Sequence, residues 1–530
     1  MKSQFVICIA FLISPLLHAQ TTPVLKSIAT NQVVAPVDIS PATTVSSGST
    51  ALRQLADRFS EVFNVKDFGA TGSGSIDDTI AIQATINAAA AAGNATVYFP
   101  QGSYLVSSSL TLPGNYQGQL SVVGSGMYSS LILGGSNAID IFSFAFGTAS
   151  ALECITIRDL GFGVAATKVP NSAIRLTNTS ALRLSRIWIA GSNSSEGGIP
   201  GQGYVNGIIL DGAWWAQIDT ILINGNEASY DGGTGAGTGS GILLVHNCVN
   251  NLFSKIQMMW FKKGITVDPL DLGFTAQGNT FSDIIMYQTD YGFYIPGGIV
   301  WTEAYQLSNI LIDNGNKPAQ TAEYAIYAVN VGDLEASHIY AICNGTSPTA
   351  ISLVMCNQVN ISGSHIISLG GGGRAIDFEA ASCHAVVTGN SFRGYTTDVY
   401  VASSCSGIVV NNNQDAATPN GTGQATTIDL TAPISKDVVG DVRGFTWCQY
   451  ISGGAATETH YFDISSCGLA QKPDGVSVHV TSDQANDCQY NWEDLGNSSS
   501  QIALRFFRRD GAILGTCYVR VSVVVSPPVR

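Results

Sequence analysis

The chain has 530 residues and a formal net charge of −14, and only 12% of its residues are charged. This balance argues against nucleic acid as a partner, because phosphate binding depends on clustered Lys and Arg side chains. A chain of this length exceeds what one compact core usually serves, so we expect either several domains or a solenoid that grows by adding repeats. The 57 glycines and the abundance of Ile, Val, Ser, Thr and Asn favour the solenoid.

The first twenty residues have the pattern of a secretory signal peptide. Lys2 precedes an apolar run from Phe5 to Leu17, and the small residue Ala19 follows. The run is shorter than the roughly 20 apolar residues that cross a bilayer. The sequence therefore predicts residues 1–20 as a signal peptide. We expect the mature chain to be secreted, to the periplasm or the exterior, with no membrane as a partner.

The chain contains 11 cysteines, one of them in the predicted signal peptide. The ten that remain are an even number, which is typical of an oxidising compartment. No CxxC pair and no histidine cluster is present, so we expect no metal site. Cys356, Cys383 and Cys405 end successive repeats at similar offsets, and their spacing leaves open whether they stack inside or form a disulfide. Four further cysteines after residue 440 predict two disulfides in a separate C-terminal domain.

After a Thr-, Ser- and Pro-rich leader over residues 21–60, the chain shows its first regular element. Asp77 and Asp78 precede an Ala-rich stretch, which predicts an N-capped helix that ends near Gly93. The alternation of residues 97–99 then predicts a strand.

This segment resembles the N-terminal signature of the pectate-lyase-like superfamily of right-handed parallel β-helix proteins. The superfamily includes polygalacturonases, rhamnogalacturonases and tailspike depolymerases. The resemblance implies that the helix caps one end of the solenoid and that Asp77 and Asp78 are capping and turn residues. The matching residues are Val65-Lys66-Asp67-Phe68-Gly69-Ala70, Asp77-Asp78-Thr79, Ala81-Ile82-Gln83 and Val97-Tyr98-Phe99-Pro100, with Gly102 and Tyr104.

From Cys154 to Asn413 two short sequence motifs, the first and the second phrase, alternate as expected of a solenoid. The first is of the type Ser185-Arg186-Ile187-Trp188-Ile189, and the second is of the type Gly241-Ile242-Leu243-Leu244. Because side chains alternate along a strand, the Ile positions should point inward and stack on the same positions of the next repeat, about 4.8 Å away. The sequence therefore predicts an all-β protein, with a right-handed parallel β-helix over residues 61–430 that carries the capping helix. A small antiparallel, sandwich-like β-domain is predicted over residues 431–530.

The residues just before the second phrase are the first candidate site, because the resemblance to polygalacturonases implies catalytic carboxylates there. Asp290 and Glu323 occupy this offset in adjacent repeats and predict a catalytic pair, since proximity separates the pKa values of two carboxyls. Aromatic side chains on the same face are suited to stacking on sugar rings. The predicted substrate-binding residues are Lys262, Lys263, Tyr291, Tyr294, Tyr324, Tyr327, Arg374 and Asp377. An alternative is that the face only supplies solubility and surface ion pairs.

A rival site lies just before the inward Ile of the first phrase. It consists of Lys255, Asp283, Asn309 and His338, with Arg186 at the same offset. Lys, Arg and Tyr on one face also suit a lyase, in which a base removes the proton next to a uronate carboxylate while cations neutralise it. The family's NTD, DDC, GHG and RIK motifs are absent, so polygalacturonase activity itself is not supported.

Three functions remain open at this point. The first is a secreted glycoside hydrolase that uses the carboxylate pair on a polysaccharide and needs no cofactor. The second is a polysaccharide lyase acting by β-elimination, with Ca²⁺ as an alternative cofactor. The third is a noncatalytic glycan-binding or surface-attachment protein. The resemblance to tailspikes adds a homotrimer as an alternative, although nothing in the sequence requires one.

Overall fold

The structure is a computed structural model, and it divides into two compact units, residues 1–58 and 59–530. The described residues are 41–55, 57, 60–114, 116–147, 154–165, 168–191, 203–225, 239–268, 276–297, 304–315, 323–380, 382–402, 404–411, 413–415, 428–430, 443–451, 457–463, 475–482, 490–497, 501–508 and 517–526. The predicted signal peptide lies outside them. In the first unit, β1 (Thr43–Thr44) pairs antiparallel with β2 (Arg53–Gln54). Among the helices that the structure describes, none has the length and hydrophobicity that crossing a bilayer requires.

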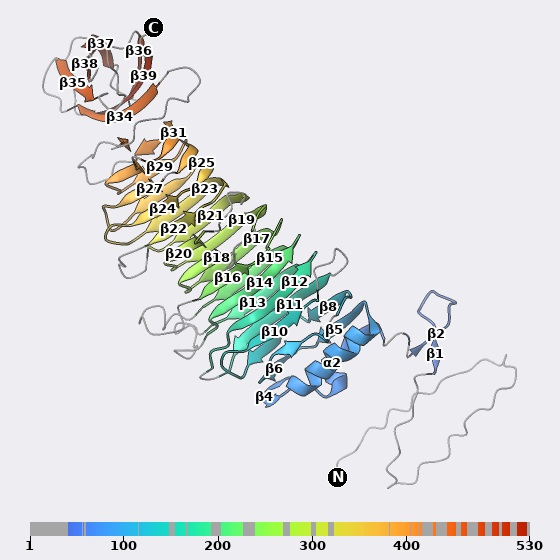
Figure 1. Ribbon diagram of the computed structural model, residues 1–530. Helices are drawn as coiled ribbons and strands as arrows, with labels where there is room; N and C mark the ends of the chain where they lie inside the picture. The colour runs from blue at the N-terminus through green and yellow to red at the C-terminus, as the bar shows by residue number, and fades with distance from the viewer. Residues whose placement is uncertain are drawn as a thin grey trace, which may run out of the picture. The chain divides into compact units, whose positions relative to one another are not determined.

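The predicted capping helix is present at the blue end of the strand stack (Figure 1). The helix α2 (Thr79–Ala92) follows the short 3₁₀ helix η1 (Val65–Phe68), and Gly93 is its C-cap. Asp78 is the N-cap residue, and its carboxylate accepts hydrogen bonds from the backbone N–H groups of Thr71, at 2.7 Å, and Gly72, at 3.0 Å. Asp78 therefore fixes the turn at Thr71 and Gly72, and its side chain makes no capping bond to α2. Asp77 bonds the start of the helix instead, because its Oδ1 accepts a hydrogen bond from the N–H of Thr79 at 3.0 Å.

Two long parallel sheets form the solenoid (Figure 1). Each turn of chain, here called a rung, adds one or two strands to the first sheet, and every rung after the first adds one strand to the second. The strands of the first sheet are β3 (Val62–Asn64), β4 (Ser73–Asp77), β5 (Ala95–Phe99), β6 (Gly102–Val106), β8 (Leu120–Gly124), β9 (Ser130–Gly134), β11 (Ile155–Val164), β13 (Arg183–Ala190), β15 (Gln217–Asn224), β17 (Leu252–Met259), β19 (Asn279–Tyr287), β21 (Ala304–Asp313), β23 (Asp333–Cys343), β25 (Asn357–Ser362), β26 (His365–Ser368), β28 (Cys383–Thr388), β29 (Ser391–Arg393), β31 (Ser406–Asn411) and β32 (Gln414–Asp415). The strands of the second sheet are β7 (Leu110–Thr111), β10 (Asp140–Ala145), β12 (Ser172–Ser180), β14 (Asn206–Trp214), β16 (Ser240–Val245), β18 (Lys263–Asp268), β20 (Tyr291–Ile295), β22 (Tyr324–Val329), β24 (Thr349–Val354), β27 (Arg374–Glu379), β30 (Thr397–Val401) and β33 (Ile428–Leu430).

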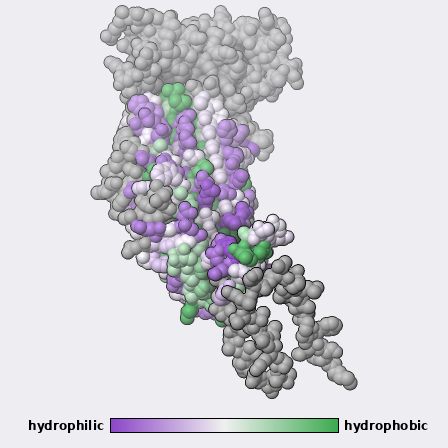
Figure 2. Space-filling model, turned by 90° about the vertical axis from the view of Figure 1, so that its right-hand side faces the viewer, coloured by the Kyte–Doolittle hydropathy of each residue, from purple (hydrophilic) through white to green (hydrophobic). Residues whose placement is uncertain are grey.

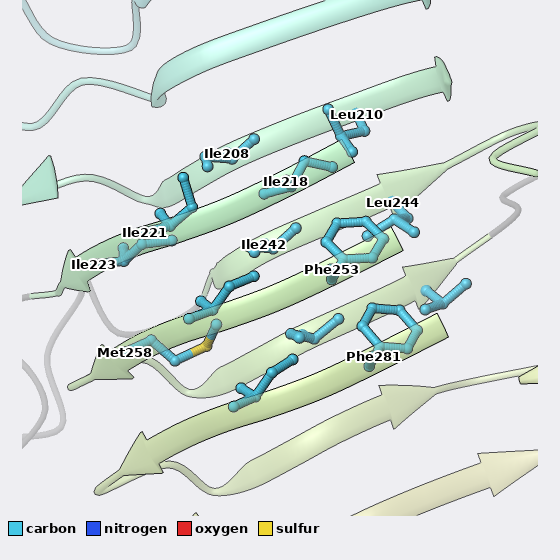
Figure 3. Close-up of a cluster of buried hydrophobic side chains, with 14 of the residues drawn as sticks. Ile208, Leu210, Ile218, Ile221, Ile223, Ile242, Leu244, Phe253, Met258 and Phe281 are labelled. Carbon is cyan, nitrogen blue, oxygen red and sulfur yellow. The ribbon is translucent and has the colours of Figure 1, made fainter. Parts of the chain in front are cut away.

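The core lies between the two sheets and consists of stacked apolar columns (Figure 3). In the first sheet, Ile221 is in register with Ile187 on one side and Ile256 on the other. In the second sheet, Ile242 pairs with Ile208 and with the next rung. These side chains are fully or almost fully buried. The predicted right-handed parallel β-helix with inward-stacked isoleucines is therefore confirmed.

Buried polar side chains lie at the bends between strands and bond to backbone groups there. The Asn251 amide donates to the carbonyl of Ala213 and to Oδ1 of Asn279, both at 2.9 Å, and its own oxygen accepts from the N–H of Ala216 at 2.8 Å. Such bonds satisfy backbone groups that the turn removes from the sheet ladder.

No disulfide is formed by the five cysteines whose side chains the structure describes, which are Cys154, Cys248, Cys343, Cys356 and Cys405. The side chain of Cys383 lies outside the described residues. Cys356 and Cys405 are buried, and each Sγ donates to a backbone carbonyl at an equivalent position two rungs apart. Of the two alternatives left open by the sequence, a disulfide between these two residues is therefore wrong. The side chains of the four C-terminal cysteines lie outside the described residues.

The last strands pair antiparallel, as predicted. They form two three-stranded sheets, and the domain boundary near residue 430 stays a prediction. The strands, in spatial order, are β34 (Arg443–Ile451), β39 (Cys517–Ser526) and β36 (Gly475–Ser482) in one sheet, and β35 (Thr457–Asp463), β38 (Gln501–Arg508) and β37 (Tyr490–Asn497) in the other.

The variant Ile221→Val is expected to lower the free energy of unfolding by about 0.5–1.5 kcal/mol, because it removes one methylene from a close-packed column. Leu222→Ala changes the next residue, which points outward and is only partly buried, so we expect a smaller loss despite the larger truncation. Denaturant unfolding of both variants measures the difference. The reverse order would contradict the inward and outward assignment of β15.

Candidate functional site

Side chains that point away from the core along the second sheet form what we call the outer face. One column of this face contains Ser240, Lys263, Tyr291 and Tyr324 on successive rungs. A neighbouring column contains Leu243, Thr266, Tyr294, Tyr327, Ser352, Asp377 and Tyr400. Residues far apart in the sequence thus become neighbours at the rung spacing of about 4.8 Å. On the side of the molecule in Figure 2, hydrophilic residues alternate with small hydrophobic patches along the solenoid.

Four tyrosines form a square at the centre of the outer face. Tyr291 stacks on Tyr324 with 5.2 Å between ring centroids, and Tyr294 stacks on Tyr327 at 5.5 Å. Within each rung the two rings meet edge to face, at 4.8 Å and 5.3 Å. Burial is the main cause that raises the pKa values of Tyr291, Tyr294 and Tyr324 above that of a free phenol. These three phenols therefore stay neutral and can donate hydrogen bonds.

Lys263 lies at one end of the tyrosine square. Its amino group is 4.0 Å from the centroid of the Tyr294 ring, which is a cation–π contact. Burial lowers the pKa of Lys263, while the charge of Asp268, at the other end of the same strand, raises it. The amino group thus lies over the face of the Tyr294 ring.

Arg374 lies beyond the other end of the square. Its guanidinium carbon is 3.5 Å from the centroid of the Tyr400 ring, and Nη1 donates to Asp377 at 2.6 Å. Asp377 is only 2% exposed, and burial raises its pKa to about 6, against the opposing effect of Arg374 and with a further increase from Glu379. Its second oxygen, Oδ1, is buried and has no hydrogen-bond partner. Arg374 therefore carries a charge that Asp377 compensates to a degree that depends on pH.

The predicted catalytic pair is not brought together on this face. Asp290 and Glu323 do occupy adjacent rungs, because the N–H of Tyr324 donates to the carbonyl of Asp290 at 2.9 Å. Asp290 is partly exposed, but Glu323 is 0% exposed, and its Oε2 accepts a hydrogen bond from the backbone N–H of Asn344 at 2.6 Å. A carboxylate buried in this way does not touch a polysaccharide on the surface. The sequence showed the shared offset but not this contact.

The predicted binding residues are brought together more closely. Lys263, Arg374, Asp377 and the four tyrosines share the outer face, whereas Lys262 precedes β18 and is exposed. The charged and aromatic groups thus form one strip along the second sheet.

The rival residues lie on the first sheet instead. Lys255, Asp283, Asn309 and His338 are exposed and have positive φ angles between 54° and 55° at equivalent places in β17, β19, β21 and β23. Asn309 donates to Asp283 at 2.5 Å. Because all four have a left-handed backbone, each residue forms a bend within its strand, which is a structural role. Their shared offset in the sequence did not indicate this role.

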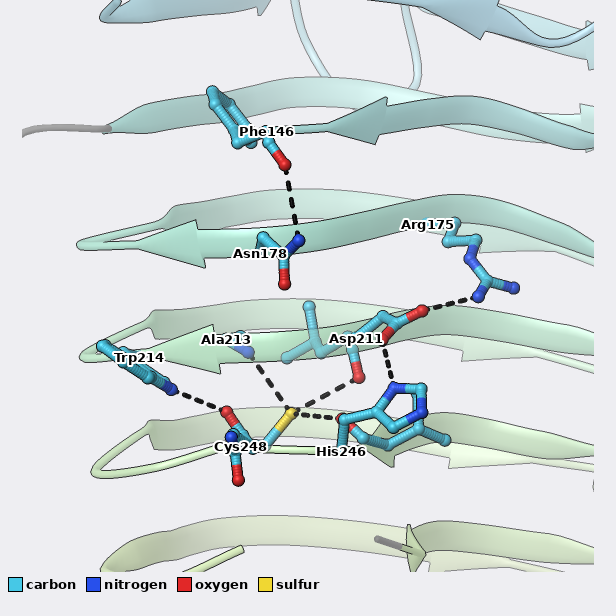
Figure 4. Close-up of polar contacts among 11 residues, drawn as sticks. Phe146, Arg175, Asn178, Asp211, Ala213, Trp214, His246 and Cys248 are labelled. Carbon is cyan, nitrogen blue, oxygen red and sulfur yellow. Dashed lines mark hydrogen bonds and ion pairs between the residues drawn. The ribbon is translucent and has the colours of Figure 1, made fainter. Parts of the chain in front are cut away.

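One cluster on the outer face was missed by the sequence analysis (Figure 4). Asp211, at 7% exposure, accepts a hydrogen bond from Nη2 of Arg175 at 2.6 Å, and its other oxygen is 2.5 Å from Nδ1 of His246. The three residues come from β12, β14 and the turn after β16. Aligning the polar residues at the ends of the second phrase would have placed Asp211 and His246 near each other.

Known proteins resemble this chain over limited parts. Two proteins of Azotobacter vinelandii, mannuronan C5-epimerase AlgE3 and alginate lyase 7, are 51% and 47% identical to it over 77 residues, which are 13% of this chain. The match spans 4% of the epimerase and 8% of the lyase. The solved A-module of mannuronan C-5 epimerase AlgE6 from the same organism has 16% identity and a TM-score of 0.45, and the alignment covers 68% of this chain and 100% of the module. Residues 62–333, about half of the sequence, match a family model, and the chain therefore belongs to the family described as rhamnogalacturonase A/epimerase, pectate lyase-like.

Proposed function

We propose that the chain binds a uronate-containing polysaccharide along the outer face of the second sheet and cleaves it by β-elimination. The observation that carries this proposal is a strip with a cation beyond each end of a square of stacked tyrosines. Lys263 lies on Tyr294 of the square, and Arg374, two rungs beyond its other end, lies on Tyr400.

The spacing of the two cations suits a polymer rather than a single sugar. Lys263 on β18 and Arg374 on β27 are separated by four rungs, or about 19 Å at the usual strand spacing. Tyrosine faces stack on sugar rings by burying apolar area, while Lys and Arg pair with carboxylates. A chain with regularly repeated carboxylates would engage both ends of the strip at once.

The chemistry of the strip supports elimination over hydrolysis. A cation on the uronate carboxylate stabilises the negative charge that develops when a base removes the neighbouring proton. Hydrolysis usually requires two reactive carboxyls with access to the substrate, and the predicted partner Glu323 is buried. The names of the curated relatives, mannuronan C5-epimerase and alginate lyase, add support for a uronate substrate.

The test is to incubate the full chain with a panel of acidic and neutral polysaccharides, with and without Ca²⁺. Ultraviolet absorbance of the unsaturated uronate and new reducing ends are read together. We expect both signals to rise on at least one polyuronate and neither on neutral glycans. New reducing ends without ultraviolet absorbance would indicate hydrolysis and contradict elimination. Proton exchange at C5 without cleavage would indicate epimerisation, and binding alone would indicate the noncatalytic alternative.

The remaining predictions about the cellular context are part of the same proposal. Export through the signal peptide would bring the protein to extracellular or periplasmic polysaccharide. A Ca²⁺ requirement and a homotrimer stay predictions. Metal dependence in the assay above and light scattering of the purified protein test them.

A further inference from the structure

We infer that His246 is the residue that transfers the proton in this elimination, with Asp211 and Arg175 as positioning residues. The inference rests on the proposed function and adds the catalytic residue that the strip of tyrosines and cations lacks. It follows from the cluster in Figure 4, which lies on the same outer face, toward the N-terminal end of the strip.

The contact with Asp211 sets the tautomer of the imidazole. An ionised carboxylate only accepts hydrogen bonds, so Nδ1 of His246, 2.5 Å from Asp211, carries a proton. In the neutral ring Nε2 is then the basic nitrogen. Arg175 bonds the other carboxylate oxygen at 2.6 Å and compensates its charge. The arrangement is that of a general base held in orientation by a buried acid.

The backbone of His246 is also specialised. Its φ angle is +55°, in the left-handed region that residues other than glycine adopt at a cost. The side chain remains 31% exposed, so a substrate on the surface can reach it. Ile209, Val245 and Thr266 also point outward, on β14, β16 and β18, and are buried. Such shelter from water strengthens electrostatic interactions on this part of the face.

The turn that carries His246 follows β16, and the neighbouring strand β18 begins with Lys263. Val245, the residue before His246, is in register with Asp268 on the following strand. The amino group of Lys263 lies 4.0 Å from the centroid of the Tyr294 ring on the strand after β18. The imidazole and the amino group therefore belong to neighbouring rungs, whose strands are about 4.8 Å apart. A polymer that runs along the outer face and pairs with Lys263 would therefore pass the rung of His246.

The reaction balances without any further reactant. Nε2 of His246 accepts the proton from C5 of the uronate, and the electron pair of that C–H bond becomes the second bond between C4 and C5. The bond between C4 and the glycosidic oxygen breaks, and that oxygen takes a proton from water. The imidazolium then returns its proton to water, so nothing is oxidised or reduced overall.

The first experiment compares His246→Ala and His246→Gln with the wild type on the polyuronate that the wild type cleaves. We expect kcat to fall about 100-fold or more, the typical contribution of a general base, while the affinity measured by calorimetry changes less than about 3-fold. Added imidazole should restore part of the activity of His246→Ala. The matched control is His384→Ala: His384 also has a positive φ, of 53°, is exposed, and has Nδ1 3.0 Å from a side-chain oxygen, that of Asn357.

A second variant tests the positioning role. Asp211→Asn should lower kcat with little change in KM, and it should alter the pH dependence of kcat/KM, which a purely structural role would leave unchanged. Wild-type kcat in both His246 variants overturns the inference while leaving the proposed function intact. The same holds if their activity is lost together with binding, or is lost without rescue by imidazole. If the wild type forms no unsaturated product from any polyuronate, the proposed function itself fails.

Discussion

A double variant, Lys263→Met with Arg374→Met, is expected to bind a polyuronate about 100-fold more weakly than the wild type. A hydrogen bond to a charged group contributes about 1.5–3 kcal/mol, and two such contacts correspond to roughly two or more orders of magnitude in affinity. Methionine keeps most of the apolar length of both side chains and removes only the charge. Isothermal titration calorimetry at low and high salt measures the loss, which should shrink as salt screens the charges.

The control must remove two positive charges from another part of the surface. The chain is already acidic, so the loss of any cation increases its repulsion of a polyanion. Arg183→Met with Lys255→Met does so on exposed positions of the first sheet. We expect this control to lose less than about 3-fold in affinity. If the control variant loses more affinity than the Lys263 and Arg374 variant, the binding site is instead the rival site on the first sheet, which includes Lys255.

The fold could be predicted from the sequence because its determinants are local and repeated. The period-two alternation around Ile187, Ile221 and Ile256 fixes which side chains face inward, and each rung repeats the same pattern. Rung alignment then brought Tyr291 next to Tyr324 and Tyr294 next to Tyr327, which the structure confirms. Neighbours in a solenoid follow directly from register.

The chemistry of the site was harder to predict, because it depends on where a side chain turns after its backbone position is fixed. Asp290 and Glu323 share an offset, but Glu323 turns to the N–H of Asn344 and is buried. His246 contacts Asp211 across 35 residues because its backbone adopts a left-handed turn. The repeat alignment can therefore indicate which backbone positions are neighbours, but not the side-chain contacts that Glu323 and His246 make.

Binding of the polyuronate is expected to strengthen about 10-fold as the pH falls from 7 to 5, which corresponds to a change of about 1.4 kcal/mol in the interaction of Arg374. Burial raises the pKa of Asp377 to about 6. Below that pH the carboxyl is neutral and no longer compensates the charge of Arg374, so the guanidinium attracts the polymer more strongly. The carboxylates of the polymer remain ionised, since free carboxyl groups titrate near pH 4.

Asp377→Asn tests this assignment, because the amide is neutral at every pH. The variant should bind at pH 7 as the wild type does at pH 5, and its affinity should change little between the two. Asp333→Asn, an exposed position on the first sheet, is the control and should keep the wild-type pH dependence. If Asp377→Asn keeps the full pH dependence, another group is responsible.

The same carboxyl should affect stability in a direction that follows from linkage. The pKa of Asp377 is raised in the folded chain from 3.8 to about 6, so the folded state binds this proton more tightly than the unfolded state. The resulting stabilisation is complete below pH 3.8 and is lost as the pH rises through 6, by on the order of 3 kcal/mol. Asp377→Asn lacks this loss, so its free energy of unfolding should rise relative to the wild type between pH 4 and pH 7. Denaturant unfolding at both pH values measures it, and a difference that is independent of pH would show that the Asp377 carboxyl is not held in this environment.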